Sequence, residues 1–475
     1  MFCLGELATA CAADGRYEFM FVVPALPLTG AAASPINPLA LYTWSVSRFT
    51  GSSWRNIVDA EFDLVIIGAG IVGLATAVKA VRRYPYLRIA VLDKEPAVAM
   101  HQTGHNSGVI HSGIYYQPGS EKARNCVAGA AAMIDFCRDY DIPYDQCGKV
   151  VVATSTSEVA ALKQLLHRGT MNGVEGLSLI GPERLHELEP HCVGVAGLHV
   201  PVTGITDFGA VARRYAELIV AVGGQLRTSC RVIAISKRQD GLILETDKGV
   251  ISTSWAINCA GLQSDRVRRL AGDREGPNIV PFRGEYYKLL PNRVHLVKNL
   301  IYPVPDVRFP FLGVHFTRMI NGGVEAGPNA VMAFKREGYH KTDFNLRDVV
   351  QAAAFPGFWR MATKYWSNGL AEMYRSFNKQ AFTVALQNLI PEIESRDLLP
   401  GGSGVRAQAL DRSGKLLDDF SIVPSGQMIH VCNVPSPAAT ASLVIADKIM
   451  DIAQTTFGLR MPIAENGAAA RSTAS

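Results

Sequence analysis

The stretch "FDLVIIGAGIVGLATAV", Phe62 to Val78, decides the fold of this 475-residue chain. Its apolar run Leu64–Ile67 predicts a short strand that is buried on both faces. After three glycines the apolar residues recur at helical spacing, so we expect a helix from Ile71 to Tyr84 that ends before a proline. A second apolar run, Arg88–Leu92, completes a strand–helix–strand unit whose two strands should be parallel.

The three glycines form the pattern Gly68-x-Gly70-x-x-Gly73 between the strand and the helix. In such a unit the first glycine permits a tight turn, the second lets the backbone approach a pyrophosphate, and the third lets the helix pack closely on the strand. The helix start adds free N–H groups and a positive dipole end. Asp93 follows Gly73 by 20 positions and is placed to accept hydrogen bonds from ribose hydroxyls. The unit predicts a dinucleotide site that suits NAD or FAD, against the alternative that the glycines serve packing alone.

The composition is that of a globular protein, with 48% hydrophobic and 19% charged residues. The net charge of +5 comes without a dense basic cluster, so we expect no nucleic-acid partner. None of the nine cysteines forms a pair with the two-residue spacing of zinc or redox motifs. We therefore expect mostly buried thiols in a reducing compartment, no disulfide framework and no metal site.

The first 60 residues differ from the rest of the chain. Phe19–Ala33 is apolar but too short, and too broken by prolines, to span a bilayer. Ser34–Val58 contains serines, Arg48 and Arg55 but no acidic residue, which is typical of a mitochondrial presequence. The alternative is an unstructured start, with Met20 as another initiator.

Further along the chain the same patterns predict more elements. We expect helices at 127–140, 157–166, 208–222 and 346–355, and strands at 149–153, 231–235, 242–246 and 254–258. The segment 281–335 is rich in aromatic residues, Gly and Pro, which predicts an antiparallel sheet. The segment 430–450 reads as strand, loop and helix.

The stretch "HQTGHNSGVIHSGIYY", His101 to Tyr116, favours FAD over NAD. With "INCAGLQSD", "FRGEYYKL", "GVHFTRMINGGVEAGPNAVMAF", "GVRAQ" and "NVPSPAATASL" in the same order, the chain resembles the D-amino-acid-oxidase-like superfamily of FAD enzymes. Within it, the chain is similar to the L-2-hydroxyglutarate dehydrogenase family from about Phe62 to Met450. One departure is Asp93, where glutamate is commoner and where either side chain should bind ribose.

The resemblance implies an α/β fold. A Rossmann-like FAD-binding domain is expected from the discontinuous segments 61–148, 203–270 and 396–455. An α+β substrate domain with a mostly antiparallel sheet is expected from 149–202 and 271–395. Residues 1–60 are then a presequence-like or disordered segment, and 456–475 a tail.

The resemblance also implies which residues surround the flavin. Ala260 and Gly261 follow a strand and offer a second bare-backbone approach, unless they form an ordinary turn. The small residues of "PSPAAT", Pro435–Thr440, precede a helix whose dipole suits the electron-rich edge of a reduced flavin. The alternative there is plain capping by Ser436 or Thr440. The full set of cofactor candidates is Gly68, Gly70, Gly73, Asp93, Lys94, Thr103, His105, Asn106, Ser107, Gly108, Val232, Ala260, Gly261, Gly404, Pro437 and Ala438.

The implied reaction oxidises L-2-hydroxyglutarate, a secondary alcohol with two carboxylates, to 2-oxoglutarate by hydride transfer to flavin. It needs a general base with a suitable pKa. His315 is our first candidate, since it shares a strand face with Thr317 while Arg318 points the other way. His111 is the second, and a purely structural role is the alternative for both histidines.

The two substrate carboxylates need cations. Arg406 lies in the glycine-rich stretch Gly402–Gln408 and could bind the carboxylate nearer the flavin bidentately, unless it forms a surface ion pair. For the distal carboxylate the candidates are Arg318, Arg283 and Lys335. Tyr302 or Tyr286 could add a hydroxyl contact.

The resemblance implies electron transfer to an acceptor such as quinone, through a peripheral membrane association, and a mitochondrial location. Covalent flavin attachment is not expected. The alternatives are an amino-acid or N-methyl-amine oxidase of the glycine/sarcosine-oxidase type, a glycerol-3-phosphate-type dehydrogenase, and a non-catalytic flavin-binding protein.

Overall fold

A computed structural model describes residues 20–22, 39–41, 58–305 and 313–461. The chain divides into two compact units, Met1–Val58 and Asp59–Ser475. In the first unit, β1 (Met20–Val22) and β2 (Leu39–Leu41) form an antiparallel pair. Most of the predicted presequence, and the end of the chain after 461, lie outside the described residues. Within the described ranges, no helix is both long and apolar enough to span a bilayer.

The strand–helix–strand unit of the sequence is confirmed. It consists of β3 (Ala60–Ile67), α2 (Ile71–Arg83) and β4 (Ile89–Leu92), and the two strands are parallel. Leu64 and Ile66 pack into a cluster with α2 and neighbouring helices, whereas Val65 and Ile67 pack on the other face of the sheet. Burial on both faces explains the continuous apolar run.

The second unit contains an eight-stranded mixed sheet built around β3. Its strands in order are β11 (Gln225–Arg227), β4, β3, β14 (Gly249–Asn258), β13 (Leu242–Thr246) and β12 (Val232–Lys237). The end of β14 also pairs in parallel with β22 (Met428–Asn433), and β22 pairs in turn with β21 (Ser421–Ser425), antiparallel to it. Each strand expected in this region is therefore present.

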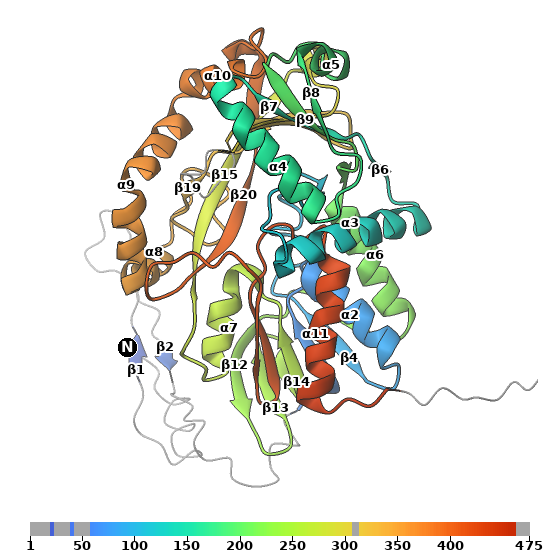
Figure 1. Cartoon of the computed structure of the whole chain (residues 1–475). Helices are drawn as coiled ribbons and strands as arrows, with labels where there is room; N and C mark the ends of the chain where they lie inside the picture. Colours follow the sequence, from blue (N-terminus) through green and yellow to red (C-terminus); the bar gives the residue numbers. More distant parts are fainter. Residues whose placement is uncertain (1–19, 23–38, 42–57, 306–312, 462–475) are drawn as a thin grey trace, which may run out of the picture. The chain divides into compact units, whose positions relative to one another are not determined.

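Helices cover one face of this sheet (Figure 1). They are α2, α3 (Glu121–Asp139), α6 (Phe208–Ala221) and α11 (Ser442–Phe457). Helix α3 begins six residues earlier than the apolar spacing indicated, because the Ser120 side chain accepts a hydrogen bond from the Ala123 N–H and caps it. On the other face, α7 (Ser264–Leu270) packs against β12 and β22.

The antiparallel sheet predicted in 281–335 is confirmed as part of a nine-stranded sheet. Five strands come from that segment, and four more join them. They are β15 (Asn278–Leu289), β16 (Leu300–Pro303), β17 (His315–Arg318), β18 (Val324–Gly327), β19 (Val331–Met332), β7 (Lys149–Ala153), β8 (Ser178–Ile180), β9 (Ala196–Val200) and β20 (Leu398–Leu410). Only β16 and β7 pair in parallel.

Within this nine-stranded second sheet, β15 and β20 are long antiparallel partners that run side by side toward α7 (Figure 1). Their register places Arg406 opposite Phe282 and Gly404 opposite Gly284. The strands β5 (Val109–Ile110), β10 (Gly204–Thr206) and β6 (Tyr144–Asp145) form a small third sheet, with β10 in the middle.

The remaining helices belong to the part of the chain that forms the second sheet. They are α4 (Val159–Met171), α5 (Pro182–Leu188), α8 (Leu346–Ala353), α9 (Pro356–Phe377) and α10 (Lys379–Gln387). The fold is thus the α/β fold expected from the sequence. The assignment of residue segments to a FAD-binding and a substrate domain stays a prediction. All seven cysteines in the described ranges are free thiols.

Candidate active site

The glycine turn is tightly packed at its first and third positions and open at its second. Gly68 has φ +115°, and a Cβ there would lie 2.5 Å from the Cys259 carbonyl oxygen. A Cβ on Gly73 would lie 2.0 Å from the Gly68 oxygen. A Cβ on Gly70 would meet only Thr103 Oγ1, at 3.5 Å. The backbone of Gly70 therefore has room beside it for a ligand.

The start of α2 faces the same opening. Its N-cap, Gly70, has no side chain to cap the helix. The Ile71 N–H donates to Thr103 Oγ1 at 3.0 Å. Because Thr103 takes this hydrogen bond, the "HQTGHNSG" loop is fixed against the helix end that would receive a phosphate.

Asp93 directly follows β4 and lines the cavity beside the turn. Its Oδ2 accepts a hydrogen bond from the Ala69 N–H at 2.6 Å, and its Oδ1 accepts one from the Glu95 N–H at 2.9 Å. The Asp93 side chain, which is shorter than the glutamate commoner at this position in the family, thus binds the backbone of the turn. Contact with ribose would use the remaining lone pairs of the same oxygens.

A cavity of about 1540 Å³ extends from the glycine turn to the second sheet. It exceeds the usual volume of sites for drug-sized ligands, so it can hold a dinucleotide and a small substrate together. All the cofactor candidates line it except Gly73 and Gly108. These two pack against backbone instead, since a Cβ on Gly108 would lie 2.7 Å from the Thr206 oxygen. The residues present therefore fit FAD.

His315 lies on β17 at the end of the cavity near the second sheet. Its Nδ1 is 2.8 Å from the Gly313 carbonyl oxygen, which can only accept, so Nδ1 carries the proton and Nε2 is the acceptor. The His315 ring stacks on Tyr302, with ring centres 3.9 Å apart. Burial lowers the pKa of His315 to about 3, and the charges of Arg406 and Lys149 act in the same direction. The ring is therefore neutral at pH 7.

His111 lines the same cavity. Burial, followed by the charges of Lys149 and His315, lowers its pKa to about 3. Its Nε2 lies 3.5 Å from Ser436 Oγ. The backbone N–H of His111 donates to Thr440 Oγ1, and the Thr440 hydroxyl donates to the Val109 carbonyl. Thr440 therefore braces the loop of His111, and α11 has no side-chain cap.

The structure separates the candidate substrate-binding residues into those that line the cavity and those that do not. Arg406, Lys335, Tyr286 and Tyr302 line the cavity. Arg283 does not line it, because its guanidinium is buried against Glu285, with Nη2 2.8 Å from Oε1. Arg318 does not line it either, because it pairs with Asp145. The structure therefore does not bring Arg283 or Arg318 to the substrate end of the site.

Sequence reasoning missed two residues at this end, Tyr115 and Lys149. Tyr115 lines the cavity, and Lys149 is buried behind it. The Lys149 ammonium lies over the rings of Tyr115 and Tyr302. A lysine that begins a strand is ordinarily solvated, so no signal in the sequence marked this one.

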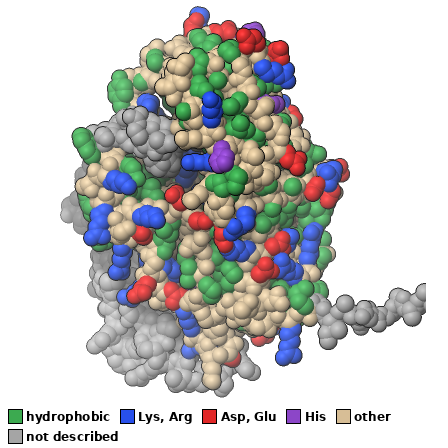
Figure 2. Space-filling model, viewed as in Figure 1, with side chains coloured by type: hydrophobic (Ala, Val, Ile, Leu, Met, Phe, Trp, Pro, Cys, Tyr) green, Lys and Arg blue, Asp and Glu red, His purple; other side chains and the backbone are tan. Residues whose placement is uncertain are grey.

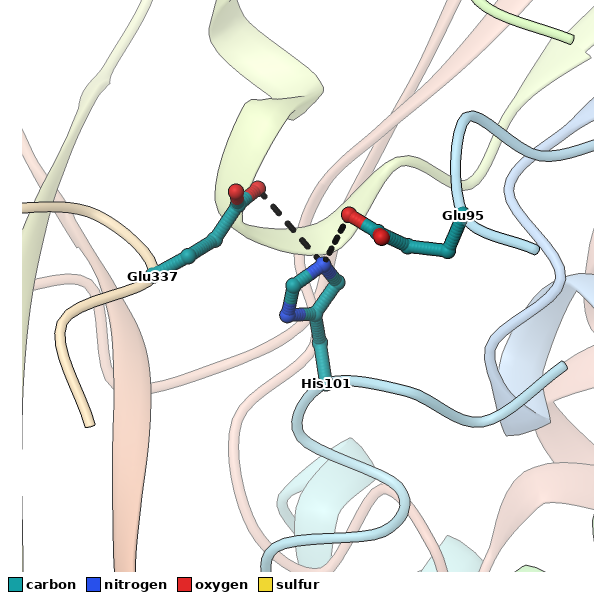
Figure 3. Close-up of side chains that lie close together, drawn as sticks. All are labelled: Glu95, His101 and Glu337. Carbon is teal, nitrogen blue, oxygen red and sulfur yellow. Dashed lines mark hydrogen bonds and ion pairs between the residues drawn. The ribbon is translucent and has the colours of Figure 1, made fainter. Parts of the chain in front are cut away.

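A second cluster of charges, shown in Figure 3, borders the cavity beyond β4. His101 Nε2 lies 2.9 Å from Glu95 Oε1 and 3.7 Å from Glu337 Oε1. The three side chains have the spacing of metal ligands. However, the Lys94 ammonium pairs with Glu95 and lies 2.9 Å from Glu337 Oε1, so it already balances the carboxylates. The cluster is best explained as an ion-pair network that ties the segment between β4 and β5 to the segment that carries Glu337.

Comparison with known proteins agrees with this site. The model of the FAD dependent oxidoreductase family matches residues 63–452, so the chain belongs to that family and uses FAD. Its curated relatives place it more narrowly among the L-2-hydroxyglutarate dehydrogenases. The sequence prediction of family, fold and cofactor is thus confirmed.

Three relatives illustrate the match, all named L-2-hydroxyglutarate dehydrogenase. That of Indibacter alkaliphilus is 53% identical over 84% of this chain and 100% of its own. That of Homo sapiens, named mitochondrial, is 46% identical over 85% of this chain and 91% of its own. That of Escherichia coli K12 is 44% identical over 83% and 93%.

Solved structures share the fold at low identity. The FAD-bound L-alpha-glycerophosphate oxidase of Mycoplasma pneumoniae has a TM-score of 0.70 and 20% identity, over 86% of this chain and 97% of that one. Glycine oxidase of Geobacillus kaustophilus has a TM-score of 0.63 and 14% identity, over 85% and 96%.

Proposed function

We propose that the protein oxidises L-2-hydroxyglutarate to 2-oxoglutarate. The observation that carries the proposal is a neutral, oriented histidine, His315, in one cavity with Arg406 and the glycine turn. The names of the curated relatives support the same substrate.

Each step has a residue to perform it. The Arg406 guanidinium binds the carboxylate beside the hydroxyl in a bidentate manner and thereby orients the carbon. His315 Nε2 accepts the hydroxyl proton, while its Nδ1–H remains bound to the Gly313 carbonyl. Stacking on Tyr302 holds the ring plane. FAD, when bound, would supply the acceptor for the hydride that leaves the carbon.

An anaerobic reduction screen tests the proposal. The purified holoenzyme is mixed with both enantiomers of 2-hydroxyglutarate, L-lactate, glycerol 3-phosphate and sarcosine, and the flavin absorbance is followed. We expect bleaching by L-2-hydroxyglutarate. Bleaching by sarcosine or another amine with release of hydrogen peroxide would support the amine-oxidase alternative, and no bleaching at all would support a flavin-binding protein without catalysis.

We propose His315 rather than His111 as the base, because the hydrogen bond to Gly313 fixes its tautomer. The matched variants His315→Gln and His111→Gln separate the two. A larger loss of turnover in His111→Gln would reverse the assignment.

We also propose that the electrons pass to a membrane quinone through peripheral association of α9. Its exposed side chains include Trp359, Trp366, Tyr374 and Phe377, the last 72% exposed. Figure 2 shows basic and hydrophobic side chains gathered over α8 and α9. Aromatic side chains with neighbouring cations suit the interfacial layer of a bilayer. We expect the wild-type protein to float with anionic vesicles. The variant in which Trp359 and Trp366 are changed to Ser should no longer float with them.

A mitochondrial location is proposed on the names of the eukaryotic relatives and on the acid-free stretch Ser34–Val58. The bacterial relatives carry no such word in their names. Import of a fluorescent protein fused behind residues 1–60 would test it.

A further inference from the structure

Lys149 is a buried cation to which the mechanism above gives no role. It is the first residue of β7, and its side chain is 2% exposed. Its Nζ lies 4.6 Å from the ring centre of Tyr115 and 5.0 Å from that of Tyr302. No ion pair between described residues includes it. A buried ammonium without an anionic partner is costly, so the group loses its proton more readily than an exposed lysine, and an anion that enters the cavity would stabilise the charged form.

The groups that face Lys149 are neutral at pH 7. From α3, Cys126 has a pKa raised by burial to about 12. From the adjoining loop, Tyr115 has a raised pKa, and from β16 Tyr302 has one as well. The histidines His111 and His315, whose pKa values the Lys149 charge helps to lower, are uncharged too. This end of the site is therefore positive, with no carboxylate among these neighbours.

Lys149 reaches the site through the rings it contacts. Tyr302 contacts both groups, because its ring stacks on that of His315 and the Lys149 ammonium lies 5.0 Å from its centre. Arg406 also acts on His315. In a buried site of low dielectric, a charge acts strongly over such distances. Two cations thus bear on the neutral base, which matches a hydroxy acid that carries two carboxylates.

We propose that Lys149 is a positioning residue that makes the site select dicarboxylates, as the countercharge of the substrate's distal carboxylate, with Arg406 serving the carboxylate beside the hydroxyl. The inference rests on the proposed function for its substrate. It assigns to Lys149 the role that the sequence left open between Arg318, Arg283 and Lys335.

A consequence can be measured without turnover. Burial lowers the pKa of Lys149 to about 7, so much of the group is deprotonated at pH 8 in the protein without substrate. A dianion beside it raises that pKa, and the holoenzyme then takes up a proton. The other groups around Lys149 do not titrate near pH 8. Calorimetry of glutarate binding in buffers of different ionisation enthalpy reports this proton.

The kinetic experiment uses L-2-hydroxyglutarate and its distal amide, in which –CONH₂ replaces the distal carboxylate. We expect the wild type to prefer the dianion. Lys149→Met should lose at least ten-fold of that preference, mainly through KM, while Lys149→Arg retains most of it. Lys149→Met should also abolish proton uptake with glutarate.

The outcomes separate the two proposals. If the wild type is not reduced by L-2-hydroxyglutarate, the proposed function fails, and proton uptake with glutarate still decides the role of Lys149. If Lys149→Met retains FAD and the dianion preference, or if Lys335→Met loses that preference instead, the inference is overturned. If Lys149→Met does not fold, Lys149→Gln replaces it. No proton uptake by the wild type also counts against the inference.

Discussion

Changing Gly73 to Ala should cost the protein its FAD. The new Cβ would lie 2.0 Å from the Gly68 oxygen and 3.2 Å from Cys259 Cβ. Real Cβ atoms keep at least 3.0 Å from such neighbours, so the turn must move by about 1 Å. The turn cannot move freely, because the Gly68 N–H donates to the Leu92 carbonyl at 2.8 Å.

The magnitude follows from this overlap. Overpacking a well-packed site costs typically about 1–3 kcal/mol, and a backbone clash belongs at the upper end. If most of that strain falls on the turn that receives the pyrophosphate, about 2.7 kcal/mol corresponds to about 100-fold weaker FAD binding. The assay is the FAD content of the purified variant, followed by fluorescence titration of the apoprotein with FAD.

Two further glycine variants make the test specific. Gly70→Ala adds a Cβ that meets only Thr103, so the protein should fold normally and yet lose FAD, because the methyl enters the ligand's place. Gly402→Ala meets no atom within 4 Å and should behave as wild type. Wild-type FAD affinity in Gly73→Ala would refute the packing argument, and a loss in Gly402→Ala would show that the glycine effects are not specific to the turn.

Three other predictions concern charges. Asp265→Ala leaves the buried Arg336 without its partner and should lower the free energy of unfolding by about 3–5 kcal/mol in urea titrations. Burial would raise the pKa of Asp265, but Arg336 lowers it, so wild-type stability should fall below about pH 4. The variant should lack this component, and an equal acid dependence would contradict the pairing. The folded-state pKa of Lys149 is about 7, below its unfolded value, so its burial destabilises the fold below that pH, and stability should rise from pH 7 to about pH 10. Denaturation of Lys149→Met at pH 7 and pH 9.5 should show a weaker rise. His315→Gln should lower turnover by about 10²–10⁴-fold with little change in KM, and an unchanged turnover would exclude His315 as the base.

Local patterns determined much of this protein. The apolar run Leu64–Ile67, the glycine spacing and the helix from Ile71 are each set by residues within a few positions of one another. The sequence therefore predicted the first β–α–β unit, and the motifs of the family predicted FAD. Most cofactor candidates line one cavity for the same reason, since they lie in loops that directly follow predicted strands.

Tertiary structure decided which charges reach that cavity. Arg318 pairs with Asp145, which lies 173 positions away, and Arg283 donates a hydrogen bond to the carbonyl of His340, which lies 57 positions away. From the sequence, Lys149 is expected to be solvated at the start of a strand. In the structure β16 pairs with β7, and the Lys149 ammonium lies over the ring of Tyr302 from β16. The partner of a charged side chain is chosen by contacts between distant segments, and no periodicity within the neighbouring residues encodes that choice. Sequence alone therefore determined the family and its cofactor, while the fold determined which charged side chains lie at the end of the cavity where the substrate is proposed to bind.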